Sequence, residues 1–110
     1  MPHIRARGLE IEAVQKVAGN IVEQLAKVTE TPNDHFTFEY ISSQFLTSGG
    51  ASPAYPYIEV LWFDRGQEMK STVAAIIDKA LRTVVDKNTD ITVVFSDLNG
   101  TDYYENGTHF

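Results

Sequence analysis

The fold is decided by the stretch from Tyr57 to Val84, YIEVLWFDRGQEMKSTVAAIIDKALRTV. Its first seven residues are nearly all apolar, which predicts a strand that is largely buried. A polar segment, residues 64–67, follows and is predicted to begin a helix, with Asp64 as the N-cap and Gln67 three residues after it. Apolar residues then recur at three- and four-residue steps, which is typical of one face of a helix: Met69, Val73, Ile76, Ile77, Ala80, Leu81 and Val84.

The same order of elements occurs in the first half of the chain. Residues 2–7 predict a short strand that ends at Gly8, and residues 10–29 predict an amphipathic helix. Residues 35–41 alternate between apolar and polar side chains, as a half-buried strand does. Residues 91–95 predict one more buried strand after the second helix. The chain is therefore predicted to be strand–helix–strand twice over.

The two halves are separated by a loop-like segment. Residues 47–55 are small and rich in Gly, Ser and Pro, and they are predicted to link halves at about 1–46 and 56–110. Residues 1–110 have the length of a single domain. Two such units can share one sheet, so we expect an α+β fold: duplicated β-α-β units forming a four-stranded mixed sheet with two helices on one face. The tail, with its two Asn-Gly dipeptides, predicts a short terminal hairpin.

The second face of this sheet predicts self-association. Both alternating faces of residues 57–63 are largely apolar, whereas two helices can cover only one face of a sheet. A large exposed apolar patch indicates an interaction surface, and closed symmetric assemblies are the commonest kind. We therefore expect a homo-oligomer whose sheets pack face inwards.

Composition excludes several classes of function. Nine basic and fifteen acidic residues give a net charge of −6, which argues against nucleic acid or an anionic membrane as the main partner. The chain has no cysteine, and its three histidines have no carboxylate at a metal-ligand spacing, so neither a disulfide nor a metal site is expected. No signal peptide or membrane-spanning run is apparent, so we expect a cytoplasmic protein.

Pro2 is the candidate catalytic residue. It follows Met1 directly, and a small second residue normally allows the initiator methionine to be removed. The mature chain would then begin with a secondary amine, and an α-amino group has an ordinary pKa of roughly 7.7–8.0. Partial burial and nearby cations lower that pKa toward the range in which a general base works best. If Met1 stays attached, the same nitrogen is a tertiary amide without basic character.

With these features the chain resembles the tautomerase superfamily, and most of all the long-chain branch that includes macrophage migration inhibitory factor. Besides Pro2 and the doubled pattern, the segments that carry the resemblance are Gly49–Pro53, Phe95–Asn99 and Asn106–Phe110, while Trp62–Glu68 and Tyr103–Gly107 resemble a small branch of unknown function. The resemblance implies a homotrimer with pockets at subunit boundaries. It also implies an N-terminal proline that acts as the base in keto–enol chemistry, with no cofactor and no metal.

The chain departs from that family at the groups that hold substrate. Relatives with keto–enol activity carry a lysine after the first helix, and the matching position here is Thr31. They also carry a tyrosine and an asparagine on the last strand, where the matching positions are about Thr92 and Val94. Activity on phenylpyruvate-type substrates is therefore not expected.

Other residues are predicted to hold a substrate instead. Arg65 is the first candidate, because its planar fork can bind both oxygens of a carboxylate; the alternative is a solvated charge paired with Asp64 or Glu68. Trp62 and Phe63 could line an apolar pocket or pack in the core or an interface. Tyr104 could donate its hydroxyl to substrate or pack in the trimer. Arg5 and Arg7 share a strand face with His3 and are expected to pair with acidic residues.

Three functional hypotheses follow. The first is a cofactor-independent tautomerase or isomerase in which Pro2 is the general base on a small, anionic, enolisable carbonyl acid. The second is a catalytically inactive homotrimer of the same fold that binds a small ligand or a protein. The third is a ferredoxin-like dimer, which shares the same order of elements.

Overall fold

The computed structural model describes residues 2–110. Its main body consists of β1 (His3–Arg7), α1 (Ile11–Thr29), β2 (Thr37–Tyr40), β5 (Tyr57–Trp62), α2 (Gln67–Leu81) and β6 (Thr92–Asp97). The shorter elements are η1 (Asn33–His35), β3 (Leu46–Thr47), β4 (Gly50–Ala51), η2 (Gly100–Asp102), β7 (Tyr104–Glu105) and β8 (Thr108–His109).

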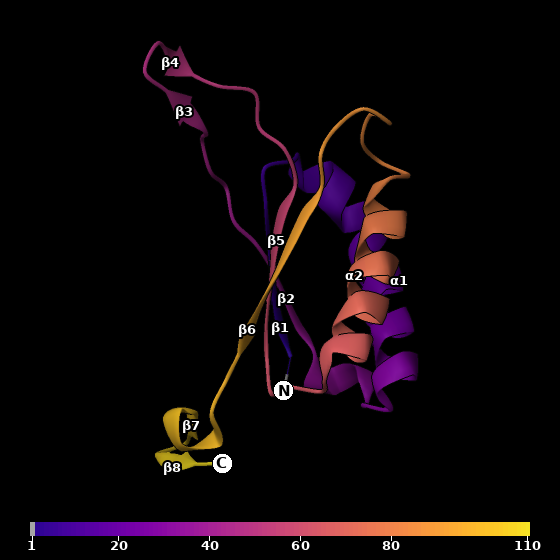
Figure 1. Ribbon diagram of the computed structural model, residues 1–110, viewed down its shortest axis with the longest axis vertical. Coiled ribbons are helices and arrows are strands. Elements are labelled where there is room, and N and C mark those ends of the chain that lie inside the picture. The colour runs from indigo at the N-terminus through magenta and orange to yellow at the C-terminus, as the bar shows by residue number, and fades with distance from the viewer. Residues whose placement is uncertain (1) are drawn as a thin grey trace.

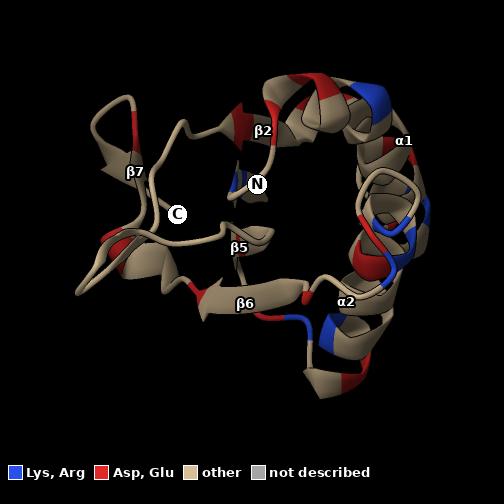
Figure 2. Ribbon diagram, turned by 90° about the horizontal axis from the view of Figure 1, so that it is seen from above, with Lys and Arg blue, Asp and Glu red and all other residues tan. Residues whose placement is uncertain are grey.

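The four long strands form one mixed sheet in the order β2-β1-β5-β6. β1 is parallel to β2, β5 is parallel to β6, and β1 and β5 run antiparallel at the centre. Both helices cover the same face of the sheet, as Figures 1 and 2 show. The predicted α+β architecture is therefore confirmed.

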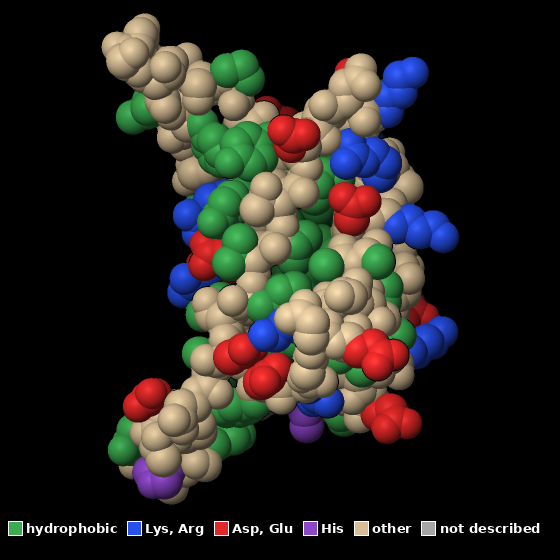
Figure 3. Space-filling model, viewed as in Figure 1, with side chains coloured by type: hydrophobic (Ala, Val, Ile, Leu, Met, Phe, Trp, Pro, Cys, Tyr) green, Lys and Arg blue, Asp and Glu red, His purple; other side chains and the backbone are tan. Residues whose placement is uncertain are grey.

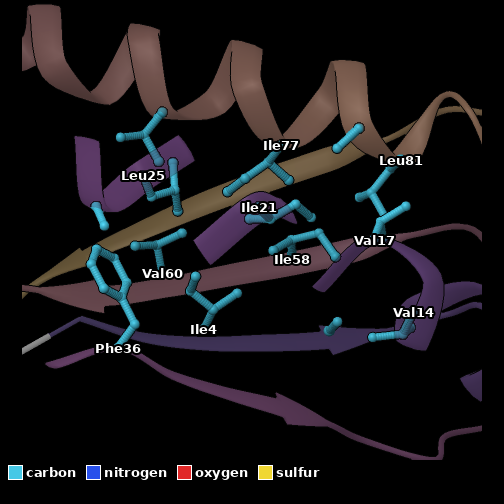
Figure 4. Packing of buried hydrophobic residues seen from close by; sticks show 14 of the residues in the cluster. Ile4, Val14, Val17, Ile21, Leu25, Phe36, Ile58, Val60, Ile77 and Leu81 are labelled. Atoms are coloured by element: carbon cyan, nitrogen blue, oxygen red, sulfur yellow. The ribbon is translucent and has the colours of Figure 1, made fainter. Parts of the chain in front are cut away.

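The core lies between the helices and the covered face of the sheet (Figure 4). Its central side chains are almost completely buried: Ile4 of β1, Ile58 and Val60 of β5, Ile21 of α1 and Ile77 of α2. Burying one such side chain stabilises the fold by about 1.5–3 kcal/mol. The core depends on strict alternation, because a one-residue slip of β5 would turn Ile58 and Val60 to the opposite face.

The open face of the sheet is more highly charged than we expected. Arg5 and Arg7 of β1 lie between Glu39 of β2 and Glu59 of β5, with N–O distances of 3.4 Å for Arg5–Glu39 and 2.5 Å for Arg7–Glu59. Figure 3 shows basic and acidic side chains together along the left rim of the molecule. The prediction of a largely apolar second face was therefore wrong at the centre of the sheet, because the acidic partners come from strands distant in sequence. The pairing of both arginines with acidic residues is confirmed.

The connection from β5 to α2 also differs from the prediction. Gly66, not Asp64, is the N-cap of α2, with φ at 90°, a conformation that glycine adopts readily. The Asp64 Oδ1 instead accepts a hydrogen bond from the Gly66 amide at 2.9 Å and closes a local turn. The consequence is that Arg65 lies outside the helix and extends toward α1.

Two small hairpins project from the body at opposite ends (Figure 1). β3 and β4 pair within the segment that was predicted as a loop, and β7 and β8 pair across the turn at Asn106 and Gly107. Asn106 and Gly107 both have positive φ, as an Asn-Gly hairpin turn requires, so the predicted terminal hairpin is confirmed.

Candidate functional site

One end of the sheet brings Pro2 close to the termini of several elements. The antiparallel register pairs His3 with Leu61, and one further step places Pro2 opposite Trp62, which in turn pairs with Asp97. The Pro2 carbonyl oxygen accepts a hydrogen bond from the Thr37 amide at 3.1 Å. Pro2 therefore lies beside the start of β2, and the start of β1 lies near the C-terminal end of α1 (Figure 1). Pro2 itself is buried.

Asp97, the last residue in the row of strand partners that begins with Pro2 and Trp62, forms an ion pair with Lys70. The Trp62 indole Nε1 donates to Asp97 Oδ1 at 3.0 Å, and the Lys70 Nζ donates to Asp97 Oδ2 at 2.6 Å. The hydrogen bond from Lys70 lowers the pKa of Asp97, and the same bond raises the pKa of Lys70. Asp97 therefore stays ionised and Lys70 stays charged at neutral pH, and each neutralises the other.

Arg65 reaches from the β5–α2 connection to the end of α1. Its Nη1 donates to the Thr29 carbonyl oxygen and its Nη2 donates to Thr31 Oγ1, both at 3.1 Å. These two bonds satisfy carbonyl and hydroxyl groups where a helix C-terminus leaves acceptors unpaired. The predicted alternative, pairing with Asp64 or Glu68, was wrong.

Arg65 differs from the other arginines in its partners. Arg5, Arg7 and Arg82 each have a carboxylate oxygen within 4.0 Å. Within residues 2–110, no carboxylate oxygen lies that close to the Arg65 guanidinium. A guanidinium has five N–H donors, and neutral oxygens use two of those on Arg65. The remaining donors and the full positive charge are available to an anion.

The other predicted ligand contacts lie in different surroundings. Trp62 is 1% exposed and tilts against Phe95, so its indole is packed in the core. Phe63 is half-buried, and its ring packs against the ring of Tyr103 with 5.2 Å between the ring centroids. Tyr104 is 63% exposed on β7, with its ring edge against His109. The structure therefore groups Pro2, Trp62 and Arg65 at one end of the sheet, and places Tyr104 outside this group on the terminal hairpin.

Among the hollows formed by residues 2–110, three lie around the sheet, and their linings include neither Pro2 nor Arg65. A hollow of about 390 Å³ lies on the open face at the Pro2 end, lined by His3, Thr37, Leu61, Leu98, Tyr103 and Glu105. A second hollow, of about 710 Å³, lies beneath the β3–β4 hairpin, and its lining includes Phe45, Tyr55 and Tyr57. A third hollow, of about 480 Å³, lies near the start of α1.

Sequence reasoning missed two polar clusters. Lys70 and Asp97 are 27 residues apart, and His3 contacts Glu39, which is 36 residues away. No spacing rule for a local motif joins such pairs. Asp97 could have been suspected from its position at the end of a strand, and His3 from its place beside Arg5 on the same strand face.

Two further observations concern the residues that the structure describes. Between residues 2 and 110 no three His, Asp or Glu side chains come together as metal ligands. Over the same range, no helix has the length and apolarity to cross a membrane.

Comparison with known proteins identifies the family. A family model described as a domain of unknown function (DUF1904) matches residues 1–109. The chain belongs to the DUF1904 family. A crystal structure of a DUF1904 domain from Sebaldella termitidis ATCC 33386 is 38% identical, with 100% of each chain covered and a TM-score of 0.92. A search of curated proteins found no match.

More distant structures extend the similarity to tautomerases. A macrophage migration inhibitory factor-like protein from Entamoeba histolytica is 14% identical, with 99% of this chain and 98% of that chain covered and a TM-score of 0.76. A fused 4-OT protein described as an asymmetric trimer is 14% identical, with 97% and 94% covered and a TM-score of 0.79. At these identities the likeness concerns the fold alone, and it confirms that this DUF1904 chain has the tautomerase fold.

Proposed function

We propose that this DUF1904 protein is a cofactor-independent tautomerase or isomerase acting on a small, anionic, enolisable carbonyl acid. In this proposal Met1 is removed and the Pro2 amine takes a proton from the carbon next to the substrate carbonyl. The electron pair of that C–H bond moves into the enolate, and the proton is returned at oxygen or at another carbon. No oxidant, reductant or second substrate is consumed.

The observation that carries this proposal is the position of Arg65. Its guanidinium is hydrogen-bonded to Thr31, which is the position where the resembling enzymes carry their substrate-binding lysine. Arg65 therefore supplies a positive charge at the place where the sequence alone shows only a hydroxyl. A planar fork suits a carboxylate better than a single ammonium does, and a nearby cation stabilises a developing enolate.

We also propose that the chain assembles as a homotrimer. The fused 4-OT neighbour is a trimer, and this chain leaves one face of its sheet without helices. That face carries the partly exposed side chains of Tyr57 and Val94, which lie away from the Pro2 end of the sheet. Sedimentation equilibrium at micromolar concentration tests this directly, and a monomer or a dimer would contradict it.

The deciding experiment compares wild-type protein with a Pro2→Gly variant on a panel of enolisable α-keto acids. Intact mass spectrometry first verifies that both proteins lack Met1. We expect the variant to be slower by about 100- to 10,000-fold, the usual contribution of a positioned general base. Pro53→Gly, an exposed proline in the β4–β5 connection, is the matched control and should keep the wild-type rate.

A second candidate function is favoured by one observation. Pro2 is buried, which suits a homotrimer that binds a small acid without turning it over. Equal rates for wild type and Pro2→Gly, together with acid binding that is lost in Arg65→Met, would support this binding function over catalysis.

A further inference from the structure

Three side chains on the open face form a continuous hydrogen-bonded series. The His3 Nδ1 lies 2.5 Å from Thr37 Oγ1, and the His3 Nε2 lies 2.9 Å from Glu39 Oε1. Thr37 and Glu39 are two residues apart on β2, so their side chains share one face, and the β1–β2 register places His3 directly opposite Thr37. The sheet itself therefore fixes a hydroxyl, an imidazole and a carboxylate in order.

The carboxylate decides which imidazole nitrogen carries the proton. The hydrogen bond from His3, aided by the Arg5 guanidinium, lowers the pKa of Glu39, so this carboxyl is ionised at neutral pH and can only accept. The His3 Nε2 must then be the N–H that donates to Glu39. In the neutral ring the Nδ1 carries a lone pair, and the Thr37 hydroxyl donates to it. Thr37 is thus hydrogen-bonded to a base that a third group orients, which is the arrangement of an activated nucleophile.

Further ion pairs hold the carboxylate in place. The Arg5 Nε lies 3.4 Å from Glu39 Oε1, and the Arg5 Nη1 lies 3.9 Å from Glu59 Oε2 on the opposite neighbouring strand. The Glu39 side chain is therefore restrained by Arg5 as well as by His3. Such restraint reduces the freedom of the imidazole that Glu39 contacts, and it positions the base in front of the hydroxyl.

A hollow opens beside these two reactive groups. His3 and Thr37 both line the cavity of about 390 Å³, and Leu61 and Leu98 supply apolar walls to it. Tyr103 also lines the cavity and carries a phenol that can donate a hydrogen bond to a substrate oxygen. A hydroxyl next to a base, an apolar wall and a second hydroxyl donor together suit a small, uncharged ester.

We propose that Thr37, His3 and Glu39 form a second reactive site that transfers an acyl group from a small apolar ester. The Thr37 Oγ forms a bond to the acyl carbon and gives its proton to His3 Nδ1, and the bond to the leaving alkoxide breaks as His3 returns that proton to it. A water molecule then gives a proton to His3 and its oxygen forms a bond to the acyl carbon; the bond from that carbon to the Thr37 Oγ breaks as His3 returns the proton to the Oγ, and the acid is released. His3 and Pro2 are adjacent residues of an extended chain, so their side chains lie on opposite faces, and this site does not depend on the Pro2 amine.

The test uses a fluorophosphonate probe, which marks activated hydroxyl groups. Attack by Thr37 forms an O–P bond, breaks the P–F bond and releases fluoride, while His3 takes the proton. We expect the adduct to map to the peptide that contains Thr37. His3→Gln should slow labelling by about 100-fold or more, and Thr37→Val should abolish it at that peptide. Thr37→Ser should retain it. Thr92→Val, on β6 of the same face, is the matched control and should label as the wild type does.

Glu39 is tested as a positioning residue through the dependence of the labelling rate on probe concentration, which separates probe binding from the bond-forming step. The charged groups around His3 are Glu39, Arg5, Glu59 and Glu105. Glu39→Gln removes the carboxylate that orients the imidazole, so the maximal labelling rate should fall while the probe concentration that gives half of that rate stays unchanged. An unchanged maximal rate would contradict the role of Glu39. Labelling that is equal in Thr37→Val, or that maps only to other residues, would overturn the proposal, and labelling that persists in Pro2→Gly would separate this site from the tautomerase site.

Discussion

The guanidinium of Arg65 lies 3.1 Å from the hydroxyl of Thr31, and this contact joins the β5–α2 connection to the segment that follows α1. Within residues 2–110, the Arg65 guanidinium has no carboxylate partner. The contact with Thr31 holds this cation at the end of the sheet where Pro2 lies. The β5–α2 connection and the segment after α1 thereby contribute together to one candidate site.

Replacing Arg65 with methionine should weaken the binding of a small α-keto acid. A hydrogen bond to a charged group contributes about 1.5–3 kcal/mol, so we expect the dissociation constant to rise by about 10- to 100-fold. Isothermal titration calorimetry measures this. Arg82→Met is the matched control, because Arg82 also donates to carbonyl oxygens after a helix, at 2.6 Å for Thr89, but pairs with Asp78. The control should lose stability and keep its affinity; equal losses of affinity would contradict the role of Arg65.

The Asp97–Lys70 pair should make stability depend on pH at both extremes. The pKa of Asp97 is lowered on folding, so its contribution is present above the ordinary value of 3.8 and is lost as the pH falls below it. The pKa of Lys70 is raised, so its contribution is present below 10.5 and is lost as the pH rises above it.

Urea unfolding of wild type and Asp97→Asn at several pH values measures this dependence. The wild type should be more stable near pH 7, and the difference should disappear as the pH falls well below 3.8. A difference between the two proteins that stays constant down to pH 2 would show that Asp97 acts through packing and not through its charge.

Gly8 should tolerate no side chain. Its φ is 86°, and a Cβ atom built there would lie 1.8 Å from the Tyr55 carbonyl oxygen. Backbone strain alone costs about 1–3 kcal/mol, and the contact adds to it, so Gly8→Ala should lower the unfolding free energy by at least that much. Gly19→Ala, in α1 with no atom within 4 Å of the new Cβ, should instead stabilise the protein by about 0.5–1 kcal/mol. Chemical denaturation of both variants checks the pair, and an equally stable Gly8→Ala would refute the close approach.

The sequence was sufficient for the two helices and the four long strands, but not for the β3–β4 hairpin or for which face of the sheet the helices cover. Alternation in β5 identified Ile58, Val60 and Trp62 as one face, and all three are buried as a set. The sequence did not predict the partners of a side chain where those partners depend on the register between strands. Glu39 and Glu59 meet Arg5 only once β2 and β5 flank β1. The partners of Arg65, Thr29 and Thr31, lie at the end of α1 and just after it, more than thirty residues earlier. The division into halves and the trimer remain predictions.

The most direct test of the central claim is deuterium exchange at the carbon next to the carbonyl of 2-oxobutanoate, followed by proton NMR in D2O. Wild-type protein that lacks Met1 should speed the loss of that proton signal, and Pro2→Gly should lose about 100-fold or more of the acceleration. Exchange at the same rate in wild type, in Pro2→Gly and in buffer alone would contradict a proline base in this protein.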